Sequence, residues 1–275
     1  MRNKITLFLF FVCLSFSVAA QSFVVQYNYS KHIMRDSTTI ISQNTFLNIE
    51  KDRSTFFSEA QYLSDSIIAS DQKLGKKINF KGLPSDLLGC FIQKKYSSKE
   101  VTYYSDEFGE HEYKYNEKPK FVWKISKESK ELLGYKAYLA TTSYAGRNYK
   151  AYFTPQIPVQ DGPYKFFGLP GLILEIFDEK RDHHFLATGI SKEKKISIDS
   201  RIATTKYIAT TKPKFVEMRK NHIETPLRRM FELMDNTQVY EKKDANGNII
   251  DMRKIFSETQ RKMIEEYKKE NKIEL

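Results

Sequence analysis

The first two thirds of the chain alternate apolar and polar side chains with a period of two. In residues 22–29 (SFVVQYNY), every second residue from Phe23 to Tyr29 is apolar or aromatic, and Gln26 and Asn28 fall on the opposite face. Because successive side chains on a strand point to opposite faces, this pattern predicts a half-buried antiparallel strand. Similar patterns predict further strands in residues 44–57, 101–105, 121–125, 134–154, 172–177, 183–190 and 194–199.

A helical pattern first occurs after Ser58, a suitable N-cap, because Ala60, Leu63 and Ile67 share one helix face. The last third contains three more helical segments, and Pro226 suits the first turn of the second. These segments are residues 212–221, 225–236 and 256–272. Strands followed by helices predict an α+β fold. We expect a curved antiparallel sheet of about 7–10 strands, with one helix after the first strands and helices at the C-terminus.

The chain begins with the pattern of a secretory signal peptide. Arg2 and Lys4 precede an apolar run over residues 5–18, and small residues end it at Ala20. A membrane helix needs about 20 apolar residues, so this run predicts a signal peptide over residues 1–20. We therefore expect an exported protein with a single domain over residues 21–275 and no later transmembrane segment. The periplasm is the expected location, with secretion or surface association as alternatives.

Composition narrows the expected partners. The full chain carries a net charge of +11, which in a cytosolic protein would favour nucleic-acid binding. An exported protein whose lysines are interspersed with glutamates is expected to bind no nucleic acid. After signal cleavage Cys90 is the only cysteine, so no internal disulfide is expected. Its apolar neighbours predict a buried, unreactive thiol.

The most patterned stretch is GPYKFFGLPGLILEIFD, residues 162–178. Its first two residues predict one turn, and a type II turn is predicted over residues 169–172, where a central glycine accepts positive φ. The glycine before this turn permits close approach of another backbone. The apolar run that follows predicts a central, mostly buried strand. The predicted structural motif comprises Gly162, Pro163, Gly168, Leu169, Pro170, Gly171, Leu172 and Ile173.

The hexapeptide at residues 168–173 resembles the signature of the GLPGLI family, exported proteins typical of Bacteroidota. The segments VWKI, LLGYKA and GRNYKAYFTPQIPVQDGP, and the final NKIEL, are also similar to segments of that family. The resemblance covers essentially the whole mature chain. Ala137 stands where the family often has cysteine, so a shared thiol role is not expected there. The family has no assigned activity, and the resemblance implies a class of exported protein without implying a reaction.

Motifs for catalysis and metal binding are weak. His183 and His184 are adjacent on a predicted strand, so they point to opposite faces, and the other histidines are scattered. The sequence contains no G-x-S-x-G elbow and no phosphate-binding glycine loop. We therefore predict no catalytic residue, no metal site and no cofactor.

Glu175 interrupts the apolar run of residues 172–177, and a buried carboxylate needs a partner. Arg147 or Lys165 is the predicted partner in a structural ion pair, with a catalytic role for Glu175 as the alternative. Glu175 and Asp178 are three residues apart on a strand and face opposite sides. This spacing disfavours a site with paired carboxylates.

Two functions remain open, and the pattern indicates no oligomeric state. The first is a non-enzymatic protein whose concave sheet face binds an apolar or peptide ligand or another envelope protein, an analogy at the level of the fold. The second is a periplasmic hydrolase near the GLPG loop, favoured by a cleft that gathers an arginine, a glutamate and a histidine. An open apolar trough favours the first. The residues predicted to bind are Tyr27, Trp123, Tyr149, Phe153, Arg147 and Glu175.

Overall fold

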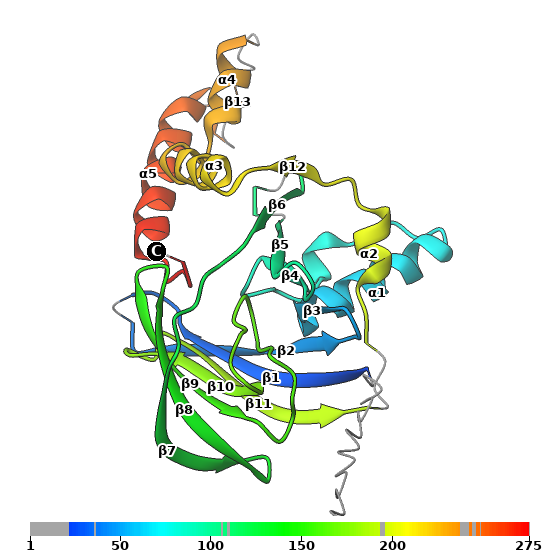
Figure 1. Cartoon of the computed structure of the whole chain (residues 1–275). Helices are drawn as coiled ribbons and strands as arrows, with labels where there is room; N and C mark the ends of the chain where they lie inside the picture. Colours follow the sequence, from blue (N-terminus) through cyan, green and yellow to red (C-terminus); the bar gives the residue numbers. More distant parts are fainter. Residues whose placement is uncertain are drawn as a thin grey trace, which may run out of the picture.

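The computed structural model describes residues 22–35, 37–105, 107–108, 111–192, 196–236, 242–243, 246–247 and 249–274. The predicted signal peptide, residues 1–20, lies outside the described residues. Within them, twelve strands form one sheet in the order β12-β6-β5-β4-β3-β2-β1-β11-β10-β9-β8-β7 (Figure 1). None of the helices among these residues is both long enough and apolar enough to cross a membrane.

The strands of the sheet are β1 (Phe23–His32), β2 (Ile40–Ile49), β3 (Arg53–Ser58), β4 (Cys90–Lys95), β5 (Glu100–Ser105), β6 (Tyr113–Glu117), β7 (Lys124–Leu132), β8 (Tyr135–Tyr144), β9 (Arg147–Thr154), β10 (Leu172–Asp178), β11 (His183–Ser191) and β12 (Ile208–Thr210). The helices are α1 (Glu59–Lys73), the 3₁₀ turn η1 (Phe80–Gly82), α2 (Asp199–Thr204), α3 (Lys212–Glu224), α4 (Arg228–Asn236) and α5 (Met252–Lys269). A separate two-stranded sheet joins β13 (Lys242–Lys243) and β14 (Ile249–Ile250).

Short local signals produce several of these elements. Ala145 and Gly146 have φ values of 47° and 79°, the two positive values of a hairpin turn that matches the twist of its strands. They join β8 to β9 at the hairpin that the sequence predicts. Ser58 caps α1, its side chain accepting a hydrogen bond from the Gln61 N–H while the Gln61 side chain bonds back to the Ser58 N–H. This reciprocal capping box fixes the first turn of the helix.

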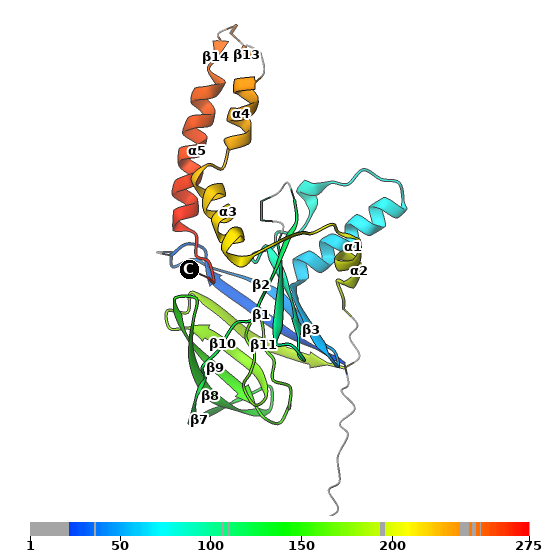
Figure 2. The ribbon, with the colours of Figure 1, turned by 45° about the horizontal axis from the view of Figure 1, so that its top comes forward.

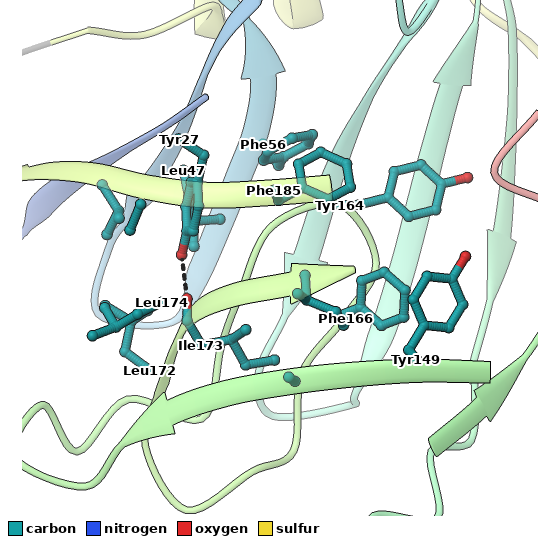
Figure 3. Close-up of a cluster of buried hydrophobic side chains, with 14 of the residues drawn as sticks. Tyr27, Leu47, Phe56, Tyr149, Tyr164, Phe166, Leu172, Ile173, Leu174 and Phe185 are labelled. Carbon is teal, nitrogen blue, oxygen red and sulfur yellow. Dashed lines mark hydrogen bonds between the residues drawn. The ribbon is translucent and has the colours of Figure 1, made fainter. Parts of the chain in front are cut away.

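Buried apolar clusters lie on both faces of the sheet. On the outer face, α1 and α2 pack near a cluster formed by Val24, Phe46, Phe57, Phe91, Tyr104, Ile196 and Ile198. The concave face holds a larger cluster, in which residues of β1, β9, β10 and β11 meet the loop over residues 155–171 (Figure 3). Within it, the Tyr27 hydroxyl donates to the Ile173 carbonyl at 2.7 Å. The loop therefore fills the curve of the sheet.

The predicted fold class is wrong. The sheet has twelve strands rather than about 7–10, and it is mixed rather than antiparallel, because β12 pairs with β6 in parallel. The placement of helices also differs, since α2 and β12 separate β11 from the C-terminal helices. The edge strand β12 has only three residues and pairs with residues 95 positions earlier in the chain. Such a distant pairing leaves no periodic signal in the local sequence.

Helices α3, α4 and α5 form an arm that extends away from the sheet (Figure 2). Phe215 fixes the base of α3, where its buried ring contacts Tyr103 and Tyr115. Helix α5 runs back along the arm, and the chain after Lys269 enters one end of the concave face. Cys90 is buried beneath this end with a free thiol, as predicted. Burial raises the pKa of the Cys90 thiol to about 12, which makes it a poor nucleophile.

Candidate ligand-binding site

The loop over residues 155–171 is anchored to the sheet by buried charges. Asp161 is fully buried, forms an ion pair with Lys94, and accepts a hydrogen bond from the Tyr96 hydroxyl at 2.7 Å. The Lys94 ammonium also donates to the Gly162 carbonyl at 2.5 Å. Burial lowers the pKa of Lys94, and the charge of Asp161 opposes that effect. The start of the GLPG-bearing segment is therefore held to β4 by a buried salt bridge that dissolved ions screen only weakly.

The turn at Gly171 differs from the predicted type II turn. The Gly171 N–H donates to the Leu169 carbonyl at 2.8 Å, the three-residue hydrogen bond of a γ-turn centred on Pro170. The φ of Gly171 is 154°, far from the value of about 80° in a type II turn. A Cβ atom at this position would lie 2.1 Å from the Thr154 carbonyl oxygen. Glycine is required because two backbone segments touch here.

Three of the four rings predicted to bind a ligand are buried in the core. Tyr27, Tyr149 and Phe153 expose 0%, 2% and 3% of their surface, because the loop packs against the same core cluster. Figure 3 shows Tyr27 and Tyr149 in this cluster beside Tyr164 and Phe166 of the loop. They fill the curve of the sheet and do not line an open surface. Trp123 precedes β7 and does not lie on a strand. Its indole N–H donates to the Phe167 carbonyl at 3.0 Å. Trp123 therefore contacts the loop over residues 155–171, which we call the motif loop.

Glu175 is buried and finds partners other than those predicted. It pairs with His184 at 2.8 Å and with Lys130, whereas Arg147 and Lys165 bind other carboxylates. Lys130 of β7 reaches Glu175 of β10 across two intervening strands, on the face of the sheet opposite Tyr149. Burial alone would raise the pKa of Glu175, but hydrogen bonds from His184 and Lys130 outweigh it and lower the pKa.

Arg147 is the centre of a different network, at the end of the concave face that α5 approaches. Its guanidinium donates to Asp178 at 2.6 Å and to Asp182 at 3.0 Å. Asp182 also contacts the His32 ring at 3.1 Å, and Asp178 accepts the His183 main-chain N–H at 3.0 Å. Glu175 takes no part in these contacts. Its partner His184 is adjacent to His183 on β11, so the two histidine side chains point to opposite faces of the sheet. The structure thus does not bring Glu175 and Arg147 into one cleft.

An open groove of about 860 Å³ lies at the opposite end of the strands, beside the motif loop. Its walls come from the start of β1, the ends of β2, β4 and β11, and loop residues 156–160. The apolar lining consists of Phe23, Ile49, Val101, Tyr135, Ile157, Pro158, Val159, Phe167 and Ile190. Its volume falls in the range of small-molecule sites, about 300–1,000 Å³. The groove is larger and more apolar than the cavity at the other end of the strands.

The rim of the groove is basic. Its exposed cations outnumber its acidic residues Glu50 and Glu100, which are themselves engaged by the Arg53 and Asn116 side chains. Lys94 also lines the groove, but it is buried and its charge is neutralised by Asp161. The exposed lysines are Lys51, Lys95, Lys99 and Lys192.

The end near α5 holds a smaller, polar cavity of about 170 Å³. Lys165 is fully buried beside it, 2.5 Å from Glu117 and 3.0 Å from the Tyr115 hydroxyl, and it also pairs with Glu274. Burial alone would raise the pKa of Glu274, but the charges of Lys165 and Lys212 lower it to about 2. The motif loop therefore touches both ends of the concave face, through residues 156–160 at the groove and Lys165 at the polar cavity.

Acid is expected to destabilise the fold before its surface carboxylates titrate. Burial, then the charges of Arg147 and Lys31, lower the pKa of His183 to about 3, whereas an unfolded chain has a histidine pKa near 6.5. The unfolded state binds the extra proton, so stability is complete above about pH 6.5 and falls as the pH drops towards 3. Denaturant unfolding at pH 7.5, 6.0 and 5.0 should show a loss of about 1 kcal/mol per pH unit.

The control for this prediction is His183→Gln, which keeps a polar side chain for the Tyr29 hydroxyl but does not titrate. Its free energy of unfolding should change less between pH 6.5 and 5.0 than that of the parent. Parallel pH profiles for the two proteins would show that His183 does not carry the effect. Glu274 contributes a second loss at lower pH, between about 4.5 and 2.

The sequence interpretation missed Lys94, Asp161 and the segment over residues 271–274. Lys94 shares a strand face with the buried Cys90 and Ile92, and a lysine at an apolar period-two position signals a buried cation. Nothing near Asp161 names its partner, because the two residues are separated by 67 positions. Among the described residues, no group of three or more histidine, cysteine, aspartate or glutamate side chains is placed to hold a metal ion.

Comparison with known proteins marks the same loop. A family model described as "Protein of unknown function (Porph_ging)" matches residues 143–175, which include β9, the loop and the first half of β10. No curated protein matches the chain. Two solved structures of PNGF-II, in space groups C2 and P2₁, superpose with a TM-score of 0.51 each at 18% and 17% identity. The match covers 72% of this chain and about a third of PNGF-II, and at this identity it shows a shared fold alone.

Proposed function

We infer that the protein is an exported binding protein, and that its groove takes an elongated apolar ligand with an anionic head group. The observation that carries this is the groove itself, a space of about 860 Å³ with an apolar lining and a lysine rim. An acyl chain would bury its methylene groups against the lining, at about 0.8 kcal/mol for each one fully buried. The head group would meet the rim lysines, whose charges also attract anions from solution.

The signal-peptide pattern and the resemblance to the GLPGLI family support export and a periplasmic location. The hydrolase alternative receives no such support, because Arg147 and Glu175 lie in separate, internally neutralised networks. Both arrangements fit structural ion pairs, which leave no free base for a substrate.

The single tryptophan reports on the groove. Trp123 bonds to the Phe167 carbonyl, and the Phe167 side chain lines the groove. We expect laurate and dodecyl phosphate each to change Trp123 emission saturably with Kd values in the micromolar range, about 8 kcal/mol of binding. Dodecyltrimethylammonium, which has the same chain and a cationic head, should bind at least tenfold more weakly. If all three amphiphiles bind equally, the rim does not select charge.

Two variants separate the lining from the rim. Val159→Asp places a charge on the apolar lining and should abolish binding. Lys95→Gln/Lys99→Gln should raise the Kd for laurate about five- to tenfold, since each exposed ion pair contributes roughly 0.2–1 kcal/mol. Lys220→Gln/Lys254→Gln on the arm removes the same charge and is the matched control, with an unchanged Kd expected. Equal losses in both double variants would point to net charge rather than to the groove.

A further inference from the structure

The segment over residues 271–274 follows α5 and lies at the polar end of the concave face without helical or strand pairing of its own. Asn271 and Ile273 are buried. The segment is held by side chains from β9 and from the motif loop. We propose that this polar end is a peptide-binding site, occupied here in cis by residues 271–274, and that it takes the same segment from a second copy of the chain.

The receptor side of the site recognises the peptide backbone as well as its side chains. The Arg147 guanidinium donates to the Asn271 side-chain oxygen and to the Lys272 carbonyl, both at 2.8 Å. The Tyr149 hydroxyl donates to the Ile273 carbonyl at 3.3 Å. Hydrogen bonds from fixed side chains to consecutive main-chain carbonyls are the means by which proteins hold an extended peptide.

One acidic side chain of the segment is recognised by several donors. Glu274 pairs with Lys165 and with Lys212, the latter at 2.9 Å. It also accepts hydrogen bonds from the Tyr164 hydroxyl at 2.8 Å and the Tyr144 hydroxyl at 3.2 Å. Charge-assisted hydrogen bonds at a buried site discriminate strongly against a neutral replacement. The ligand class is thus a short extended peptide with an amide, an aliphatic and an acidic side chain in the order Asn-x-Ile-Glu.

The receptor groups have partners that remain when the peptide leaves. Arg147 uses one nitrogen for Asp178 and Asp182 and its other terminal nitrogen for the segment. Lys165 keeps Glu117 and the Tyr115 hydroxyl when Glu274 is removed. Neither cation would be left buried and unpaired, so the site does not depend on the segment for its charge balance. A preorganised site of this kind favours exchange of its ligand.

The site also has space and an unused polar atom beside the segment. The cavity of about 170 Å³ is lined by residues 270–274 on one side and by β1, β4 and β5 on the other. Asn271 is 1% exposed, yet its side-chain nitrogen has no hydrogen-bond partner. A segment with an unsatisfied buried donor is bound less tightly than its surroundings permit. The cis segment therefore leaves one polar group and some space in the site unused.

The test uses the full chain and a labelled peptide, acetyl-ENKIE-amide, which covers residues 270–274. In the parent the cis segment competes at an effective concentration in the millimolar range, so the peptide should bind weakly. In Asn271→Ala/Glu274→Gln the cis segment is weakened, and we expect at least a tenfold lower apparent Kd by fluorescence polarisation. The peptide with Gln in place of its final Glu should bind that variant at least tenfold more weakly.

A variant ending at Glu270 provides the second measurement. It should bind the peptide more tightly than the parent and more tightly than Asn271→Ala/Glu274→Gln. The matched control is Lys220→Gln/Lys254→Gln, which should bind as the parent does. Circular dichroism establishes that each protein is folded. No peptide binding by a folded variant up to 1 mM, or equal binding of the Glu and Gln peptides, overturns the proposal. If the truncated chain does not fold, the full-length variant alone decides.

This site lies at the end of the strands opposite the groove, so the two binding events are measured separately. The proposed groove ligands are read by Trp123 emission, and the peptide is read by its own label. Loss of laurate binding with retained peptide binding would remove only the groove function. The reverse result would remove only the peptide site.

Discussion

Replacing Gly171 by valine is expected to lower the free energy of unfolding by about 4 kcal/mol or more, enough to prevent folding. A Cβ atom here would sit 2.1 Å from the Thr154 oxygen and 2.5 Å from its carbonyl carbon. Both are main-chain atoms at the junction of β9 with the loop, so they cannot move aside as a side-chain tip would. Removing the clash requires the loop to leave the concave face, which would expose the core it covers.

Gly134→Val is the matched control for this variant. Gly134 also has a positive φ, 77°, but nothing lies within 4 Å of an added Cβ. Gly134→Val should therefore lower the free energy of unfolding only through backbone strain, by about 1–2 kcal/mol. Urea unfolding of both variants measures the difference. Equal losses would mean that positive φ, and not the contact with Thr154, makes glycine necessary in the GLPG turn.

Replacing Lys94 by methionine is expected to cost about 3–5 kcal/mol of stability, because it leaves Asp161 charged and buried without its cation. Tyr96 and the Gly162 N–H still donate to Asp161, but hydrogen bonds do not replace a full positive charge. Lys94→Met/Asp161→Asn should recover part of the loss, since the unpaired charge is gone. Both free energies follow from denaturant unfolding at neutral pH.

The control is Lys220→Met on the arm, where the Lys220 and Glu224 side chains are more than half exposed. An exposed pair of this kind contributes little, so its loss should change stability by less than about 0.5 kcal/mol. A double variant no more stable than Lys94→Met would show that the pair matters through packing rather than charge. The groove should also change in Lys94→Met, because the same loop forms one of its walls.

The motif loop contacts both ends of the concave face, and this explains why its sequence is the most patterned in the chain. Residues 156–160 line the apolar groove, Asp161 holds the loop to β4, and Lys165 reaches the peptide site. Gly171 then brings the chain back against β9. A loop that covers a core and borders two candidate sites is constrained at nearly every residue.

The sequence by itself determined the local elements. Period-two alternation located β1 and β9, Ser58 located the start of α1, and Ala145-Gly146 located a hairpin. These features depend on interactions within a few residues, namely side-chain alternation, a cap and a turn. The same reasoning placed Glu175 and Asp178 on opposite faces, which their separate partners confirm.

Only the tertiary structure decided which surfaces are open and which charges meet. Tyr27, Tyr149 and Phe153 alternate as an open aromatic face would, but the loop over residues 155–171 closes over them. Glu175 pairs with Lys130, which lies three strands away in the sheet, and β12 joins β6 across 95 residues. Contacts between distant residues depend on how the whole sheet bends, and a local pattern carries no record of that bend.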